Sequence, residues 1–150
     1  MSSKIFSLGD ICLVTDYVAN GSFASLKENV EYEPDGYAVL VRFTDFSKGW
    51  NGNYKFISKS SYEFLNKSKL FPEDSIVTNV GYPGKTFILP DLGKPMSLAP
   101  NALLVRPDKD ILNNYYLKYL IHSPYGQALI ESISSGAAQN KFNKTSFRAI

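Results

Sequence analysis

Short apolar stretches rich in β-branched and aromatic residues recur through the first two thirds of the chain, and they predict strands. These stretches are Tyr37–Phe43, Tyr54–Ile57, Ser75–Val80, Thr86–Leu89 and Asn101–Arg106. Between the third and the fourth, Pro83 and Gly84 take the second and third positions of a turn that begins at Tyr82. Proline and glycine at these positions suit a type II turn, so we expect a hairpin there.

After Pro107 the apolar residues follow helical spacing. Asp110 can cap a helix, whose inward face would be Ile111, Leu112, Tyr115, Tyr116, Tyr119 and Leu120. Ser123 followed by Pro124 predicts the start of a second helix, in which Tyr125, Leu129 and Ile133 recur before a stop at Gly136. Strands first and helices last favour an α+β fold, with a mostly antiparallel or mixed, twisted β-sheet and C-terminal helices.

A chain of 150 residues is expected to form a single domain over residues 1–150, because no repeat or linker interrupts it. Residues 44–53 and 90–100 are rich in Gly, Pro and Asn and are predicted to be loops that carry function. The chain contains no apolar run near the roughly 18 residues of a membrane span, and its first residues lack the apolar region of a signal peptide. We therefore expect a cytoplasmic protein without a membrane partner.

The net charge of +2 is unevenly distributed. Residues 1–40 contain six acidic residues and two lysines, whereas residues 41–150 contain fourteen basic and eight acidic residues. Such asymmetry permits a surface that faces a polyanion, but solvated basic faces are common, so charge alone does not identify the partner.

Side chains suited to catalysis are scarce. The single cysteine, Cys12, excludes an internal disulfide and predicts a small buried side chain, and the single histidine, His122, is expected to be a partly charged capping or surface residue at a helix end. With one histidine and one cysteine, a closed zinc site would need carboxylates as its remaining ligands. Gly81, Gly84 and Lys85 lack the spacing of a Walker A loop. The sequence therefore argues against an autonomous enzyme.

Two basic stretches, residues 42–59 and 139–148, combine cations with amides, hydroxyls and aromatic rings. Cations can hold phosphates, while Asn, Thr and Arg can read base edges. The predicted DNA-binding residues are Arg42, Thr44, Lys48, Trp50, Asn51, Asn53, Lys55, Tyr82, Lys85, Gln139, Asn140, Lys141, Asn143, Lys144 and Arg148. The alternative is that both stretches are solvated, with the aromatic rings of the first folded back on the core.

Within this set, Lys141, Lys144 and Arg148 are predicted to hold phosphates, because no acidic residue accompanies them in the stretch from 135 to 150. Arg42 and the 44–55 loop would supply base or groove contacts. Phe142 and Phe147 are expected to anchor the last stretch on the domain.

Several short motifs occur in a characteristic order. They are Leu8–Ile11 (LGDI), Val41–Phe46 (VRFTDF), Leu70–Val77 followed by Val80–Lys85, Leu98–Arg106, Tyr116–Ser123, and Ser135–Lys144 (SGAAQNKFNK). Glu73 stands where glycine is usual, and Ala138 stands where threonine is common. Over residues 5–150 this order resembles the target-recognition domain of the DNA-specificity (S) subunit of Type I restriction–modification systems.

This resemblance implies a non-catalytic module that binds double-stranded DNA and reads one half of a bipartite site. Methyltransferase (M) and restriction (R) subunits would then carry out adenine methylation and restriction, using S-adenosylmethionine, ATP and Mg, and the chain itself would need no cofactor. The long spacer helix and second recognition domain of the family are absent from these 150 residues, so the chain is either one recognition domain or a natural half-subunit. A single domain is expected to bind DNA weakly, because it lacks a linked partner.

Two other functions remain open from the sequence. A β-rich module could bind carbohydrate or another ligand by stacking it on Trp50 and on tyrosine rings, and such binding would be insensitive to salt. A stand-alone or methylation-dependent nuclease is disfavoured by the lack of acidic and histidine clusters. The DNA sequence recognised and the oligomeric state cannot be derived from the chain.

Overall fold

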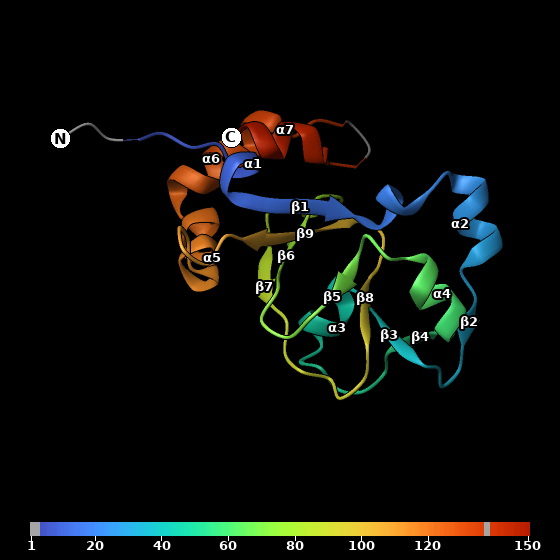
Figure 1. Cartoon of the computed structure of the whole chain (residues 1–150). Helices are drawn as coiled ribbons and strands as arrows, with labels where there is room; N and C mark the ends of the chain where they lie inside the picture. The colour runs from blue at the N-terminus through green and yellow to red at the C-terminus, as the bar shows by residue number, and fades with distance from the viewer. Residues whose placement is uncertain (1–3, 137–138) are drawn as a thin grey trace.

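The computed structural model describes residues 4–136 and 139–150, and it contains two β-sheets (Figure 1). The first sheet has the order β1 (Cys12–Asp16), β9 (Ala102–Pro107), β6 (Ser75–Thr78), β7 (Thr86–Ile88), and all its pairs are antiparallel. The second has the order β2 (Tyr32–Glu33), β4 (Lys55–Ile57), β3 (Ala38–Val41), β8 (Met96–Leu98), β5 (Lys69–Leu70). Within the second sheet β3 and β8 run parallel. The predicted α+β class with antiparallel and mixed sheets is confirmed.

Most of the helices lie on the outer faces of the two sheets (Figure 1). Helices α1 (Leu8–Ile11), α5 (Asn114–His122), α6 (Pro124–Ile133) and α7 (Lys144–Ala149) lie on the first sheet. On the second sheet lie α2 (Phe23–Asn29) and α4 (Lys59–Phe64). The short α3 (Phe43–Ser47) follows β3, and a 3-10 helix, η1 (Tyr17–Asn20), follows β1.

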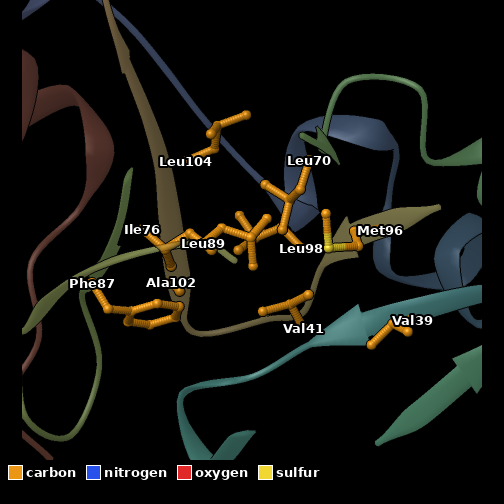
Figure 2. Packing of buried hydrophobic residues seen from close by; sticks show 10 residues of the cluster. All are labelled: Val39, Val41, Leu70, Ile76, Phe87, Leu89, Met96, Leu98, Ala102 and Leu104. Atoms are coloured by element: carbon orange, nitrogen blue, oxygen red, sulfur yellow. The ribbon is translucent and has the colours of Figure 1, made fainter. Parts of the chain in front are cut away.

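Three hydrophobic clusters fill the space between these layers: one between the two sheets, and one between each sheet and its helices. The central strands are therefore buried on both faces. Val39 and Val41 of β3 point into the cluster between the sheets, shown in Figure 2, whereas Ala38 and Leu40 face the outer cluster with α2 and α4. In the first sheet, residues of β6 and β9 likewise alternate between the middle cluster and the cluster under α5, α6 and α7. Burial on both faces explains the uninterrupted apolar runs.

The five predicted strands are confirmed as β3, β4, β6, β7 and β9. Gly84 has φ of 88°, as the third position of a type II turn requires, and β6 and β7 form the predicted hairpin. The two predicted loops were wrong in part. Residues 90–100 contain β8, a three-residue strand between prolines, and residues 44–53 begin within α3. The remaining strands, β1, β2 and β5, were not predicted.

The two C-terminal helices exist, but the first was predicted with the wrong cap and the wrong face. Asn113, not Asp110, caps α5 by accepting the backbone N–H of Tyr115 at 2.8 Å. Leu117 and Ile121 form its buried face, while Ile111 and Leu112 lie in the turn that precedes the helix. The three tyrosines are exposed, Tyr115 by 53%, Tyr116 by 60% and Tyr119 by 71%.

Helix α6 begins as predicted, with Ser123 as its cap and Pro124 as its first residue. Its buried face, however, is Gly126 and Ile130, while Tyr125 is exposed. A Cβ at position 126 would collide with the carbonyl of Leu120, so glycine lets α6 pack closely on the end of α5. The helix ends at Ile133, three residues before the predicted stop at Gly136.

Candidate nucleic-acid interface

The first basic stretch is closed at its base by an ion pair, which we call the Arg42–Asp45 latch. Arg42 Nη2 lies 2.8 Å from Asp45 Oδ1 and also donates to the carbonyl of Asn53 at 3.0 Å. Asp45 Oδ2 accepts the backbone N–H of Arg42 at 2.8 Å, which caps α3. The Asp45 side chain is 3% exposed and that of Arg42 is 28% exposed. Arg42 therefore holds the two ends of the 43–53 loop together.

Trp50 fixes the far side of this loop to the core. Its ring centroid lies 5.7 Å from that of Phe87, and its backbone has φ of 59°. Phe46 stacks on Phe87 at 4.8 Å. For these two rings the alternative that the aromatics fold back on the core is confirmed, and the loop presents Lys48, Asn51 and Asn53 to solvent.

The last basic stretch is held on the first sheet by two phenylalanines. Phe142 and Phe147 are 4% and 0% exposed and stack at 5.6 Å, so the predicted anchoring is confirmed. The backbone N–H of Gly81 donates to the backbone carbonyl of Asn140 at 2.8 Å, and the backbone N–H of Phe142 donates to the backbone carbonyl of Asn79 at 3.0 Å. These bonds fix residues 139–142 beside the turn between β6 and β7. Ala137 and Ala138 of the SGAAQNKFNK motif lie outside the described residues.

The cations of the last stretch differ in availability. Lys144 Nζ lies 2.8 Å from Asp16 Oδ1, so the expectation that its charge is uncompensated was wrong, because the acid comes from β1. Arg148 donates to the carbonyl of Val14 on the edge of the first sheet. Lys141 is exposed and forms no ion pair with a described residue.

Two hollows lie beside these stretches. The loop hollow, about 310 Å³, is lined by Tyr32, Leu40, Arg42, Phe43, Thr44, Lys55, Thr78, Val80, Tyr82, Ala99, Pro100, Asn101 and Ala102. The tail hollow, about 450 Å³, is lined by Asp16, Val18, Asn79, Val80, Ile133, Ser135, Lys141, Phe142, Asn143, Lys144 and Thr145. Val80 belongs to both, so the two hollows adjoin at the end of β6.

Local hydrogen bonds position the side chains around this junction. Thr78 Oγ1 donates to the carbonyl of Tyr82 at 2.6 Å and accepts the N–H of Lys85 at 3.0 Å, which holds the turn with Tyr82 74% exposed. The Lys55 ammonium lies 5.1 Å from the centre of the Tyr32 ring, and both residues line the loop hollow. Asn143 caps α7 through Ser146 N at 2.8 Å.

The structure brings together part of the predicted site. Arg42, Thr44, Lys55 and Tyr82 line the loop hollow, and Lys141, Asn143 and Lys144 line the tail hollow. The remaining predicted residues line neither hollow: Lys48, Trp50, Asn51, Asn53, Lys85, Gln139, Asn140 and Arg148. Of these, Gln139 and Asn140 are exposed and adjoin Gly81.

Arg148 lines a third hollow, the β1 hollow, together with Lys67, Lys69 and Arg106. The cations here have other partners as well. Arg106 pairs with the buried Asp74 through two bonds of 2.8 and 2.7 Å, and Lys69 lies 4.6 Å from the centre of the Tyr62 ring. The hydrogen bond to Asp74 raises the pKa of Arg106. The Arg106–Asp74 pair thus connects the Leu70–Val77 motif to the Leu98–Arg106 motif and supports the fold.

Sequence reasoning missed Asp16, Asn79 and Asn101, which line the hollows. Asn79 follows β6 and donates to the carbonyl of Phe142 at 3.1 Å. Asn101 has φ of 74° in the tight turn from β8 to β9, and the Pro100-Asn101 pair was the available signal for that turn. Asp16 was counted only as a negative charge of the first forty residues.

The described residues offer no catalytic cluster. Burial raises the pKa of Cys12 to about 11, which favours an inert thiol. His122 Nε2 accepts the backbone N–H of Thr86 at 3.0 Å, and burial, then Lys118 and Lys85, lower its pKa. The expectation of a partly charged imidazole was therefore wrong. Residues 4–136 and 139–150 contain no group of three potential metal ligands, and none of their helices is long and apolar enough to cross a bilayer.

The fold of this chain is similar to the folds of solved Type I specificity subunits. It is similar to the S subunit of a Type I restriction–modification system from M. genitalium, with 12% identity and a TM-score of 0.56. It is also similar to the HsdS subunit from Thermoanaerobacter tengcongensis, with 15% identity and a TM-score of 0.58. Each match covers 96% of this chain. No protein-family model and no curated protein matches the sequence.

These two matches confirm at the level of the fold the resemblance drawn from the motifs. The chain spans about a third of the length of the two solved structures, 32% and 31%. Sequence identity is low in both, so the matches establish the architecture, and the role of the residues depends on the site itself.

Proposed function

We propose that this chain is a DNA target-recognition module of the kind found in Type I specificity subunits, without catalytic activity of its own. One observation carries the proposal. Two basic, amide-rich stretches, residues 42–59 and 139–148, line two hollows that adjoin at Val80. Cations beside amide and hydroxyl groups are the combination that protein–DNA interfaces use for phosphates and base edges.

The two hollows divide these tasks. Lys55 and Lys141 provide one exposed lysine in each hollow, suited to phosphates. Thr44, Tyr82 and Asn101 present hydroxyl and amide groups in the loop hollow, and Asn143 and Thr145 do so in the tail hollow. Arg42 acts chiefly by closing the loop, while Lys48, Asn51 and Asn53 at its exposed end supply further contacts.

In an intact system the module would read one half of a bipartite site and direct partner methyltransferase and restriction subunits to it. The cofactors of methylation and restriction would be bound by those subunits. This part of the proposal rests on the fold and on the motif order, and it is tested by co-purification of the chain with a Type I methyltransferase subunit.

The DNA proposal is tested by the fluorescence anisotropy of labelled duplexes titrated with the chain at several salt concentrations. We expect weak binding whose logarithmic affinity falls linearly with the logarithm of the salt concentration. The variant K55A/K141A removes one exposed lysine from each hollow, and its slope should be shallower by about two units. The control K67A removes an exposed lysine of the β1 hollow and should keep the wild-type slope. An unchanged slope in the double variant would contradict the proposed interface.

A carbohydrate-binding module remains the second candidate, favoured by the exposed tyrosines, among them Tyr82 at 74% and Tyr119 at 71%. Trp50 contributes less to it than the sequence suggested, because its ring packs against Phe87. Binding to a glycan array that does not change between low and high salt, together with no binding to duplex DNA, would favour this function.

A further inference from the structure

Asp16 is an acidic residue inside the tail hollow, where the proposed function predicts contact with a polyanion. It ends β1 and caps η1 by accepting the backbone N–H of Ala19 at 2.9 Å. Its side chain is 14% exposed and lies 2.8 Å from the Lys144 ammonium. A lone carboxylate in this place would repel phosphates, so its presence needs an explanation.

The hydrogen bonds of this carboxylate are distributed unequally. Both the Ala19 N–H and the Lys144 ammonium donate to Oδ1. No hydrogen bond from a described residue reaches Oδ2, although Asp16 lines the hollow. The result is a carboxylate whose orientation is fixed at one oxygen and whose charge is balanced by a neighbouring lysine, while the other oxygen keeps its full capacity as an acceptor.

We propose that Asp16 is a base-reading residue, which accepts a hydrogen bond at Oδ2 from the exocyclic amino group of cytosine or adenine in the major groove. The inference rests on the proposed DNA-binding function. An acceptor can pair with cytosine N4 or adenine N6, whereas guanine O6 and thymine O4 are acceptors themselves and are repelled. Asp16 thus separates amino-bearing from carbonyl-bearing bases at one position of the site.

Lys144 is a positioning residue in this arrangement rather than a phosphate contact. Its ammonium lies against Asp16 Oδ1, and its side chain is only 26% exposed. By holding Oδ1 and balancing the charge, it lets a carboxylate approach DNA without net repulsion. Lys141 of the same hollow has no ion-pair partner among the described residues and keeps the phosphate role.

The variant D16N gives this inference a directional test. An asparagine can still accept from Ala19 and Lys144 at Oδ1, and its Nδ2 then places a donor where Oδ2 was. The wild-type chain and D16N are each used to select from a pool of randomised duplexes, and the enriched pools are sequenced. At one position the preference should change from cytosine or adenine to guanine or thymine, by about five-fold or more, while the other positions stay unchanged.

A second variant keeps the inference falsifiable if D16N is poorly folded, which thermal unfolding would reveal. K144Q should weaken the preference at the same position and leave the salt slope within about half a unit of wild type, whereas K141A should lower the affinity for all sequences alike. If the wild type is selective and D16N selects the same sequences, the base-reading role of Asp16 is overturned alone. The same holds if the salt slope of K144Q is shallower by about one unit while its base preference is unchanged. No DNA binding by the wild type overturns the inference and the proposed function together.

Discussion

The 43–53 loop and the 139–150 segment look alike in sequence, because both combine lysine or arginine with amides and aromatic rings. In the structure they are held by different means. The Arg42–Asp45 latch closes the loop with charged groups, while Phe142 and Phe147 bury the segment against the first sheet. The cations differ as well, since Lys48 projects into solvent and Lys144 is paired with Asp16.

This difference shows that a basic residue in a sequence indicates only a potential contact with phosphate. Whether its charge is available depends on an acidic partner that is often distant in the chain, as Asp16 is from Lys144. Of the three variants that follow, the first two separate these means of support and the third tests the hydrogen bond of His122, in order of decreasing expected effect.

Truncation of Phe147 should have the largest effect on stability. F147A removes a fully buried ring that stacks on Phe142 under α7, and we expect a loss of about 3–5 kcal/mol in the free energy of unfolding. Urea denaturation followed by circular dichroism measures this loss. The control F23A truncates a ring that is 84% exposed and should leave stability unchanged. Near-wild-type stability of F147A would show that the segment does not depend on its aromatic anchor.

Breaking the Arg42–Asp45 latch should reduce the stability of the chain less than truncation of Phe147 does. D45N removes the charge that pairs with Arg42, and we expect a loss of roughly 1–3 kcal/mol, because hydrogen bonds between charged groups are replaced by weaker ones. The matched control is D35N, whose carboxylate pairs with Lys94 but is 83% exposed, so solvent screens the interaction. Hydrogen exchange should increase in residues 43–53 of D45N and remain unchanged in residues 139–150. An equal increase in hydrogen exchange in both regions would contradict the conclusion that the loop and the segment are held independently.

The smallest effect concerns His122, whose Nε2 accepts the backbone N–H of Thr86 at the start of β7. Its pKa is lowered in the folded chain, so the unfolded chain binds the proton more readily and stability falls as pH drops below about 6.5. H122Q lacks this contribution. We therefore expect the melting temperature of the wild type to fall more than that of H122Q between about pH 7.5 and about pH 5.5. An equal or larger fall in H122Q would mean that the bond to Thr86 does not make stability depend on pH.

The sequence was sufficient to predict the elements with strong local patterns. The strands that became β3 and β9 contain the uninterrupted apolar runs Ala38–Val41 and Ala102–Val105, and Pro83 with Gly84 specifies the turn between β6 and β7. The cap of α6 is equally local, since Ser123 and Pro124 adjoin. The order of short motifs indicated the fold that the solved structures then confirmed.

The features that were missed depend on contacts distant in the chain. Strand β8 has only three residues and is recognisable by its pairing with β3 and β5 rather than by its own composition. The tyrosines of α5 share the helical spacing of a core face, but Leu117 and Ile121 are buried because they pack in the cluster with β6, β9 and α6. In the candidate site, Asp16 could not be assigned because Lys144 lies 128 positions further along the chain.

The closed base of the 43–53 loop has a consequence for how such a domain diverges over generations. Arg42 joins its own end of the loop to Asn53, and beyond this closure Gly49 and Gly52 have open space around them. Residues inserted beside Gly52 would leave the sheets and their shared core untouched as long as Trp50 keeps its packing against Phe87. The loop can therefore change in length at its exposed end without losing the packing that keeps the domain folded.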